Sequence, residues 1–342
     1  MTNIEFGCRP TIIASDPNTD AQKACDQITK YLKDIPCWPQ LPKRNFKENM
    51  CLQYAEGCPG LVIEDGRFYI NRNQDLTGAM EEFYTAYMAD DDDKFAISPD
   101  YADGLDTFLK MDNLLPWAVK GQVTGPVTWG LTVTDEDKRG ILYDDVFSDI
   151  VPKLLKMKAS WQEKLLKKIS PNTIIFLDEP YMSAYGATGV ILSEEQIISL
   201  IEEVFSGISG LKGIHCCGNT DWSILLKTSM DILSFDAYNY PQSLSLYPEA
   251  IEAFLKRGST IAWGIVPTDE EALAKESVAS LKDRLEEALA PFTRQGIPFK
   301  TLITQGLLTP SCGLGSLVNA DLSTTALELV TGLSAEIRQR YA

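Results

Sequence analysis

Short apolar segments alternate with longer amphipathic stretches over most of this chain, and this alternation restricts its possible folds more than any other feature. From Ala118 onward, apolar runs predict strands at 118–123, 173–178, 212–217, 231–236, 260–266 and 301–307. Helical patterns separate them, at about 145–168, 194–206, 247–257, 270–290 and 321–340. Strands that alternate with helices form parallel β-α-β units, so we expect an α/β fold with a parallel sheet.

The number of these units indicates a closed barrel. A β-branched run at 11–15 brings the strands to seven, and we expect an irregular eighth within 35–60. Eight units correspond to a (β/α)8 barrel, the TIM barrel. A doubly wound sheet is the alternative, but no Gly-x-Gly-x-x-Gly motif follows the first strand. Since no linker divides the chain, we predict a single domain over residues 1–342, with insertions near the N-terminus.

Local signals mark three helix starts and one hairpin. Each helix start is a pair of residues at capping-box spacing: Thr19 and Gln22, Ser193 and Gln196, and Thr268 and Glu271. The first pair predicts a helix through about Tyr31, and another helix is expected at about 77–88. Residues 61–70 indicate a hairpin that turns at Asp65-Gly66.

Charge and cysteine content limit the partners and the compartment. The chain has 48 acidic and 31 basic side chains, and its formal net charge is −17. Nucleic acid and anionic membranes are therefore not expected as partners, because no Lys/Arg cluster offsets this charge. No apolar run approaches the roughly 18 residues of a membrane span, and residues 1–5 lack the features of a signal peptide. Eight irregularly spaced cysteines do not resemble a disulfide framework, so we expect the protein to be located in the reducing cytoplasm.

The chain has one histidine, His215, which lies two residues before Cys217 at the end of the expected strand 212–217. Side chains two apart on a strand share a face, so His215 and Cys217 should point the same way and Cys216 the other. Imidazole and thiolate are both zinc ligands. The alternative is a core histidine beside two buried thiols, and these residues alone do not decide between the two interpretations.

Residues suited to chemistry also follow other expected strands. In a barrel, the C-terminal ends of the strands converge at one mouth. The residues at these ends are Ser15, Asp178, His215, Cys217, Asp236 and Cys312. Two thiolates, an imidazole and a carboxylate from neighbouring units suit a tetrahedral zinc site.

Five short motifs resemble, in the same order, those of the cobalamin-independent methionine synthases, in particular their C-terminal catalytic barrel. They are Ile13-Ala14-Ser15-Asp16-Pro17, Val123-Thr124-Gly125-Pro126-Val127-Thr128, Ile175-Phe176-Leu177-Asp178-Glu179-Pro180, His215-x-Cys217 and Pro310-Ser311-Cys312-Gly313-Leu314. The resemblance extends over nearly the whole chain. The wider superfamily also contains corrinoid:coenzyme M methyltransferases and uroporphyrinogen decarboxylase, but the decarboxylase needs no metal, so the two cysteines disfavour it.

The resemblance implies one zinc ion per chain, held by His215, Cys217 and Cys312. The family's carboxylate ligand is a glutamate, and Asp236, one methylene shorter, takes its position here. It would act as the fourth ligand or as a partner of a ligand. Together with Asp178, the three zinc ligands form the expected catalytic set.

The same resemblance implies a site for an amino-acid substrate. It places the carboxylate of that substrate on Ile13 and Ser15, and its ammonium group on Asp178. A second carboxylate for the ammonium would fall near residues 44–50, where Glu48 is the candidate. Zinc deprotonates a bound thiol and leaves it nucleophilic, so the implied activity is methyl transfer to homocysteine, giving methionine. One alternative is methyl transfer to another thiol, such as coenzyme M. The other is a zinc-binding or corrinoid-carrying barrel without enzymatic activity.

Two departures from the family pattern concern the methyl donor. Ala184 stands where the family has a glutamate that contacts folate, and no histidine follows the expected strand 260–266, where the family has a catalytic one. The chain also resembles a short form without the N-terminal barrel of the long enzymes. We therefore predict a methylcorrinoid donor, either methylcobalamin or a corrinoid protein. A folate-dependent methionine synthase is the alternative, in which Trp129 or Trp263 would stack on the pterin.

Overall fold

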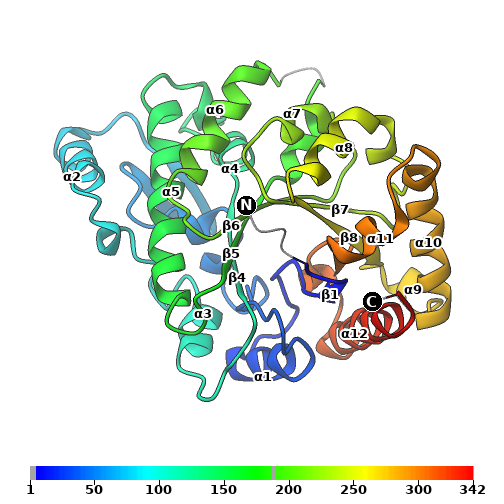
Figure 1. Cartoon of the computed structure of the whole chain (residues 1–342). Coiled ribbons are helices and arrows are strands. Elements are labelled where there is room, and N and C mark those ends of the chain that lie inside the picture. Colours follow the sequence, from blue (N-terminus) through cyan, green and yellow to red (C-terminus); the bar gives the residue numbers. More distant parts are fainter. Residues whose placement is uncertain (1–4, 187–189, 342) are drawn as a thin grey trace.

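Parallel strands form a strongly curved sheet in the computed structural model of this chain, which describes residues 5–186 and 190–341. The sheet has seven strands in the order β1-β9-β8-β7-β6-β5-β4. Helices surround the strands on the outside (Figure 1). The strands are β1 Arg9–Pro10, β4 Val119–Thr124, β5 Thr173–Asp178, β6 Leu211–Cys216, β7 Ile232–Phe235, β8 Thr260–Val266 and β9 Gly306–Pro310.

The helices follow the strands in alternation, as expected for β-α-β units. They are α1 Ala21–Tyr31, α2 Thr77–Met88, α3 Asp103–Leu109, α4 Pro126–Thr132, α5 Phe147–Leu166, α6 Glu194–Phe205, α7 Trp222–Leu226, α8 Pro248–Lys256, α9 Glu270–Leu273, α10 Val278–Arg294, α11 Phe299–Thr304 and α12 Ala320–Tyr341. Short 3-10 turns lie between them, including η1 Phe46–Glu48, η3 Asp92–Phe95 and η5 Pro180–Ala184.

The irregular eighth strand is the segment 37–40, which closes the sheet into a barrel. It forms isolated parallel bridges to both edges, between Cys37 and Lys120 of β4 and between Gln40 and Ser15 after β1. The Gln40 amide donates to the Ala14 carbonyl at 3.0 Å, and the Lys120 amide donates to the Pro36 carbonyl at 2.9 Å. The predicted (β/α)8 barrel is thus confirmed, with an incomplete ladder at this seam.

The side chain of Gln162, on α5, completes the ladder where the segment 37–40 does not reach. Its Oε1 accepts from the Gln122 amide and from the Trp38 indole, both at 2.9 Å. Its Nε2 donates to the Gln122 carbonyl, also at 2.9 Å. Gly121 makes the approach possible, because a Cβ there would lie 1.9 Å from Gln162 Oε1. One glutamine therefore pairs with the β4 backbone as a neighbouring strand would.

Two sequence predictions near the C-terminus are wrong. The expected strand at 301–307 is mostly helix α11, and strand β9 begins only at Gly306. The predicted capping box at Thr268 and Glu271 is also absent, because the Asp269 side chain caps α9 by accepting from the Ala272 amide at 2.9 Å. An aspartate one position later is the stronger N-cap and takes the role.

The other local predictions can be compared in the same way. Ser193 and Gln196 form the predicted capping box at the start of α6. The first helix, however, is capped by Asp20 rather than by Thr19. The predicted hairpin is β2 Leu61–Glu64 and β3 Arg67–Ile70, and α2 has the predicted bounds.

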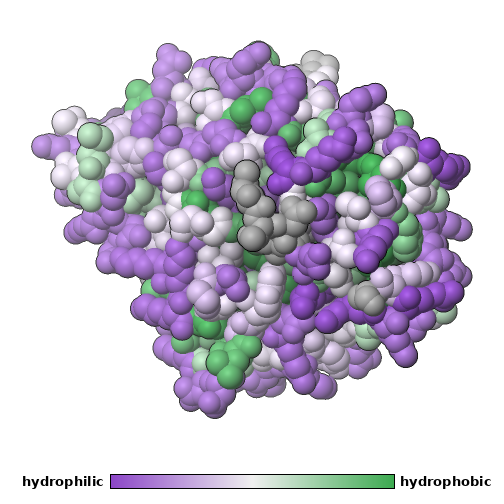
Figure 2. Space-filling view, viewed as in Figure 1, coloured by the Kyte–Doolittle hydropathy of each residue, from purple (hydrophilic) through white to green (hydrophobic). Residues whose placement is uncertain are grey.

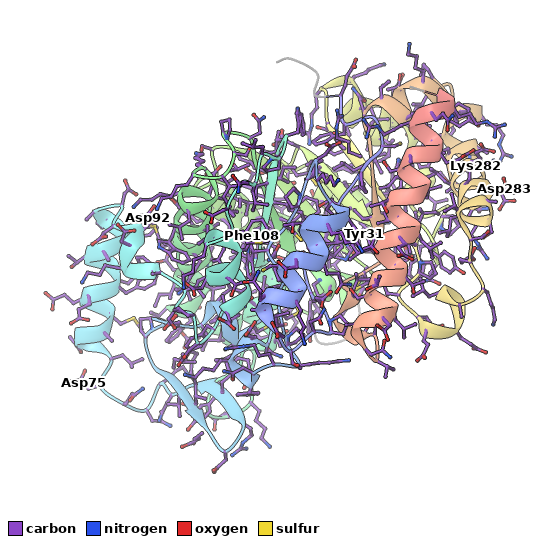
Figure 3. The ribbon with its side chains drawn as sticks, turned by 90° about the horizontal axis from the view of Figure 1, so that it is seen from below. Tyr31, Asp75, Asp92, Phe108, Lys282 and Asp283 are labelled. Carbon is purple, nitrogen blue, oxygen red and sulfur yellow. The ribbon has the colours of Figure 1, made fainter. Side chains whose placement is uncertain are left out.

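The first and last helices lie side by side and complete the outer ring. Figure 3 shows Tyr31 on α1 facing α12, and its hydroxyl donates to Glu328 at 2.8 Å. The face shown in Figure 2 is mainly hydrophilic, with scattered apolar side chains. Within the described ranges, none of the helices is both long and apolar enough to cross a membrane.

Candidate metal centre

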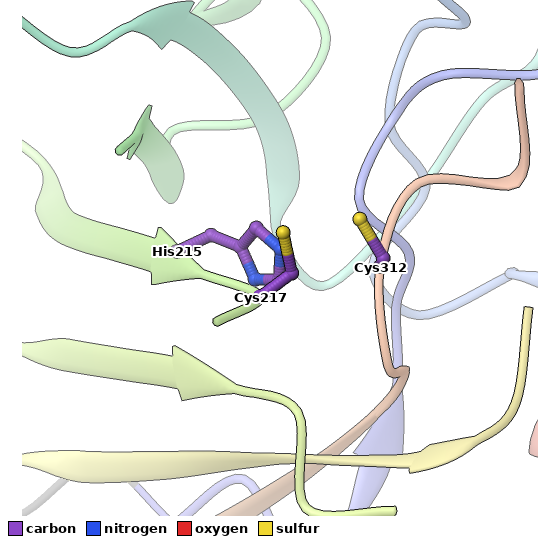
Figure 4. A group of neighbouring side chains, drawn as sticks. All are labelled: His215, Cys217 and Cys312. Atoms are coloured by element: carbon purple, nitrogen blue, oxygen red, sulfur yellow. The ribbon is translucent and has the colours of Figure 1, made fainter. Parts of the chain in front are cut away.

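The barrel brings His215, Cys217 and Cys312 together at the C-terminal ends of its strands. His215 is in β6, Cys217 directly follows this strand, and Cys312 follows β9. Their ligand atoms all lie within 4.8 Å of one another. Figure 4 shows both sulfur atoms beside the imidazole ring. Cys216 instead belongs to the apolar core, as the strand alternation predicted.

The imidazole of His215 is oriented for ligation. Its Nδ1 lies 3.0 Å from the hydroxyl of Ser234, on the neighbouring strand β7. Its Nε2 is buried and has no hydrogen-bond partner among the described residues. A partner on one ring nitrogen fixes the ring and leaves the other free for a metal. One imidazole and two thiolates suit zinc, and three protein ligands leave a fourth position for a substrate.

One thiol of the centre, that of Cys217, differs electrostatically from the other cysteines. The hydrogen bond with Cys312, helped by His215, lowers the pKa of Cys217 far below its usual range, although burial opposes this. The same contact and burial raise the pKa of Cys312. By contrast, burial raises the pKa of Cys216 to about 12. The pair of Cys217 and Cys312 therefore loses a first proton more readily than the buried thiols of the core do.

Contacts between two of the sequence motifs hold Cys312 in place. The Ser15 carbonyl accepts from the Leu314 amide at 2.9 Å, and its hydroxyl accepts from the Gly315 amide at 3.3 Å. Gly313 is required by this packing, because a Cβ there would lie 2.0 Å from the Ser15 hydroxyl. Ala14 has a positive φ of 31°, which turns the chain beside this contact. The structure therefore places Ile13 and Ser15 next to the cysteine motif.

Asp178 ends β5 and pairs in register with His215. It is 7% exposed, and its Oδ1 has no hydrogen-bond partner among the described residues. Burial raises the pKa of this carboxyl, while Lys120 and His215 oppose the shift. A buried carboxylate with a free oxygen is suited to a cationic partner.

Glu179 has a role that the sequence did not reveal. Its carboxylate accepts hydrogen bonds from the Val127 amide at 2.9 Å, from the Thr128 amide at 2.7 Å and from the Thr128 hydroxyl at 2.6 Å. Gly125 allows this approach, because a Cβ there would lie 2.2 Å from the carboxyl carbon. Two of the recognised motifs are therefore bound to each other, and this fixes the neighbouring Asp178. In the sequence, the only signal of this contact was that both motifs occur in the same chain.

Asp236 and Glu48 are not part of the three-residue cluster. Both carboxylate oxygens of Asp236 accept from Asn239, at 2.8 Å from its amide and 2.7 Å from its side chain. Glu48 is buried and binds Arg44 at 2.7 Å and the Leu41 amide at 3.1 Å, and burial raises its pKa to about 7. Zinc ligation by Asp236 and contact of Glu48 with a substrate ammonium remain predictions.

A cavity of about 530 Å³ opens beside the two cysteines. Asp236, Asp269 and Glu270 line it, and no basic residue is among the lining residues within 5–186 and 190–341. The two tryptophans suggested for pterin stacking do not reach it. Trp129 is fully buried and donates to the Cys51 carbonyl at 2.8 Å. Trp263 is 1% exposed and packs edge-on between two phenylalanine rings of the core, so that suggestion is wrong.

Comparison with known proteins adds information about the fold. No protein-family model and no curated protein matches the sequence. A proposed vitamin-B12-independent methionine synthase from Listeria monocytogenes matches with a TM-score of 0.56 and 14% identity, over 94% of this chain and 86% of that one.

Two further solved structures are similar to parts of the chain. A B12-independent methionine synthase from Shewanella sp. W3-18-1, in complex with selenomethionine, has a TM-score of 0.48 and 17% identity, over 69% of this chain and 66% of that one, just under two thirds of it. A methyltransferase from Methanosarcina mazei has a TM-score of 0.47 and 18% identity, over 73% and 67%. From the Listeria match, the chain has the TIM-barrel-like α/β fold of that protein.

Proposed function

We propose that this chain is a zinc-dependent S-methyltransferase that transfers a methyl group from a methylcorrinoid to the thiol of homocysteine, giving methionine. The observation that supports it most is the cluster of His215, Cys217 and Cys312 at the barrel mouth, next to the strand that ends in Asp178. Two thiols, with an imidazole nitrogen and a carboxylate oxygen that have no partner among the described residues, meet the needs of an amino-acid thiol and its metal.

Each group has a separate task in this scheme. Zinc, when bound, would supply the Lewis acidity that keeps a substrate thiol deprotonated at neutral pH. His215, Cys217 and Cys312 would hold it and leave one position for the substrate sulfur. Asp178 would bind the ammonium group, and the turn that contains Ile13 and Ser15 would receive the carboxylate. The substrate is then held at both ends, which orients its sulfur toward the incoming methyl group.

The cavity beside the cysteines supports a donor other than folate. In the part of the chain that the structure describes, its charged lining residues are all acidic, which disfavours the polyanionic tail of a polyglutamylated folate. A folate amine also requires protonation by a positioned acid when it leaves. Methyl transfer from cobalt does not require that acid, because the departing Co(I) is a good leaving group.

Calorimetric titration of the zinc-loaded protein with L-homocysteine tests the proposed acceptor. We expect Asp178→Asn to weaken homocysteine binding about 30-fold or more, because loss of one partner of a buried charge pair costs about 2–5 kcal/mol. Elemental analysis should still find one zinc ion per chain. Asp93→Asn, at an exposed acid on η3, makes the same change in net charge and should bind homocysteine like the wild type.

Two results would contradict the proposed acceptor. One is an unchanged affinity of Asp178→Asn for homocysteine. The other is tighter binding of coenzyme M than of homocysteine to the wild-type protein, because a sulfonate has no ammonium group for Asp178 to bind.

A further inference from the structure

Strand β4 carries two long polar side chains into the interior of the barrel. Lys120 and Gln122 are two residues apart, so they share a face, and both are fully buried. The Lys120 ammonium lies 4.5 Å from the centre of the Phe176 ring, on the neighbouring strand β5. Buried polar groups in a strand are unfavourable unless they have partners, so their contacts are informative.

The contact between these two residues sets the orientation of the Gln122 amide. Lys120 Nζ donates to Gln122 Oε1 at 3.5 Å. Lysine has only donors to offer, so it fixes the oxygen of the amide toward itself. Gln122 Nε2 must then point elsewhere, and it is buried without a partner among the described residues. An unpaired buried donor requires an acceptor.

The complementary unpaired atom lies on the next strand. Gln122 pairs in register with Phe176, and Asp178 follows two residues later on the same face of β5. Gln122 and Asp178 are therefore diagonal neighbours, a separation that long side chains span. Within the described ranges, Gln122 offers an unpaired donor and Asp178 an unpaired acceptor. An α-amino acid carries the complementary pair, a carboxylate and an ammonium group on one carbon.

We infer that Gln122 binds the α-carboxylate of the amino-acid acceptor through Nε2, opposite the ammonium group held by Asp178, and that Lys120 is the positioning residue for the amide. This inference rests on the proposed function. It adds a side-chain donor from β4 to the contacts expected from Ile13 and Ser15, which a carboxylate can accept together because it has several lone pairs.

Three thiols separate the two ends of the substrate. L-Homocysteine has both charged groups, 4-mercaptobutyrate lacks the ammonium group, and 3-aminopropanethiol lacks the carboxylate. Each is titrated into the zinc-loaded wild-type protein and into Gln122→Met, whose side chain has a similar size but no donor. We expect homocysteine and 4-mercaptobutyrate to bind about 10- to 100-fold more weakly to the variant, as for a lost hydrogen bond to a charged group. The affinity for 3-aminopropanethiol should remain within about twofold of wild type, since that ligand has nothing for Nε2 to bind.

Gln122→Glu provides a second test with the opposite sign for one ligand. Its carboxylate should repel homocysteine and 4-mercaptobutyrate and tighten the binding of 3-aminopropanethiol. Zinc content and the circular dichroism spectrum of both variants should match the wild type. Equal losses of affinity for all three thiols would mean that Gln122 has only a structural role, and would overturn the inference. Unchanged affinities would also overturn it, because a water molecule would then satisfy Nε2. If the wild type binds none of the three thiols, the proposed function fails as well.

Discussion

Cys216 and Cys217 are neighbours in the chain, but their thiols lie on opposite faces of the end of β6. Cys216 is fully buried in the core, and its thiol donates to the Gly218 carbonyl at 3.5 Å. Cys217 faces His215 and Cys312 in the candidate metal centre. This pair provides a matched comparison between a structural and a ligating cysteine.

We predict that Cys217→Ser and Cys312→Ser each lose bound zinc, because a hydroxyl is a much poorer zinc ligand than a thiolate. Cys216→Ser should retain one zinc ion per chain, although it places a hydroxyl in the core. Elemental analysis after gel filtration measures the zinc content of all three variants. Full zinc occupancy in either of the first two would exclude the assigned ligand set.

Some site residues were predictable from the sequence and others were not. His215 and Cys217 could be paired because the two-residue repeat of a strand is local, and Cys312 because it lies in a recognised motif. Gln122 gave no such signal. Its role can be inferred only from the contact with Lys120 and from the position of Asp178 on the neighbouring strand β5. Polar residues inside an apolar strand are informative only when their partners are known.

At the scale of whole elements, the sequence predicted the alternation of strands and helices better than the identity of each segment. Residues 301–307 contain threonine and isoleucine, which are frequent in strands, but residues 301–304 belong to α11. The segment is too short for its period to separate helix from strand. The irregular eighth strand was expected within 35–60, but its bounds at 37–40 could not be predicted, because side chains far away in sequence complete the hydrogen bonds at this seam.

The seam gives an element-scale prediction. Gln162→Leu would leave the Gln122 amide, the Gln122 carbonyl and the Trp38 indole with fewer partners in a buried place. We expect the free energy of unfolding to fall by about 3 kcal/mol, because each unpaired buried group costs about 1–3 kcal/mol and these costs overlap. Urea denaturation measures this change. Gln22→Leu, on the exposed side of α1, is the control and should change stability by about 0.5 kcal/mol or less. An equal change in the free energy of unfolding for both variants would mean that Gln162 does not stabilise the seam.

At the scale of the whole molecule, the barrel concentrates its candidate chemistry at one end. The metal ligands, Asp178 and the turn before Ser15 lie at or just after the C-terminal ends of strands, where the connecting loops of a barrel converge. The overall charge of −17 and the acidic cavity beside the cysteines act in the same direction on an incoming donor. Both disfavour a polyanionic donor, and neither hinders one without excess negative charge.

The methyl donor is the prediction that depends on the whole molecule. We expect the zinc-loaded protein to form methionine from homocysteine with methylcobalamin or a methylated corrinoid protein, and not with methyltetrahydrofolate. A folate donor needs a positioned acid, but the one histidine of this chain lies in the metal cluster, and neither buried tryptophan can stack on a pterin. Each donor is incubated separately with protein and homocysteine, and methionine is measured by mass spectrometry, with Cys312→Ser as the inactive control. Methionine formed from methyltetrahydrofolate without any corrinoid would contradict the prediction, because the chain would then have to protonate the folate with a group other than His215.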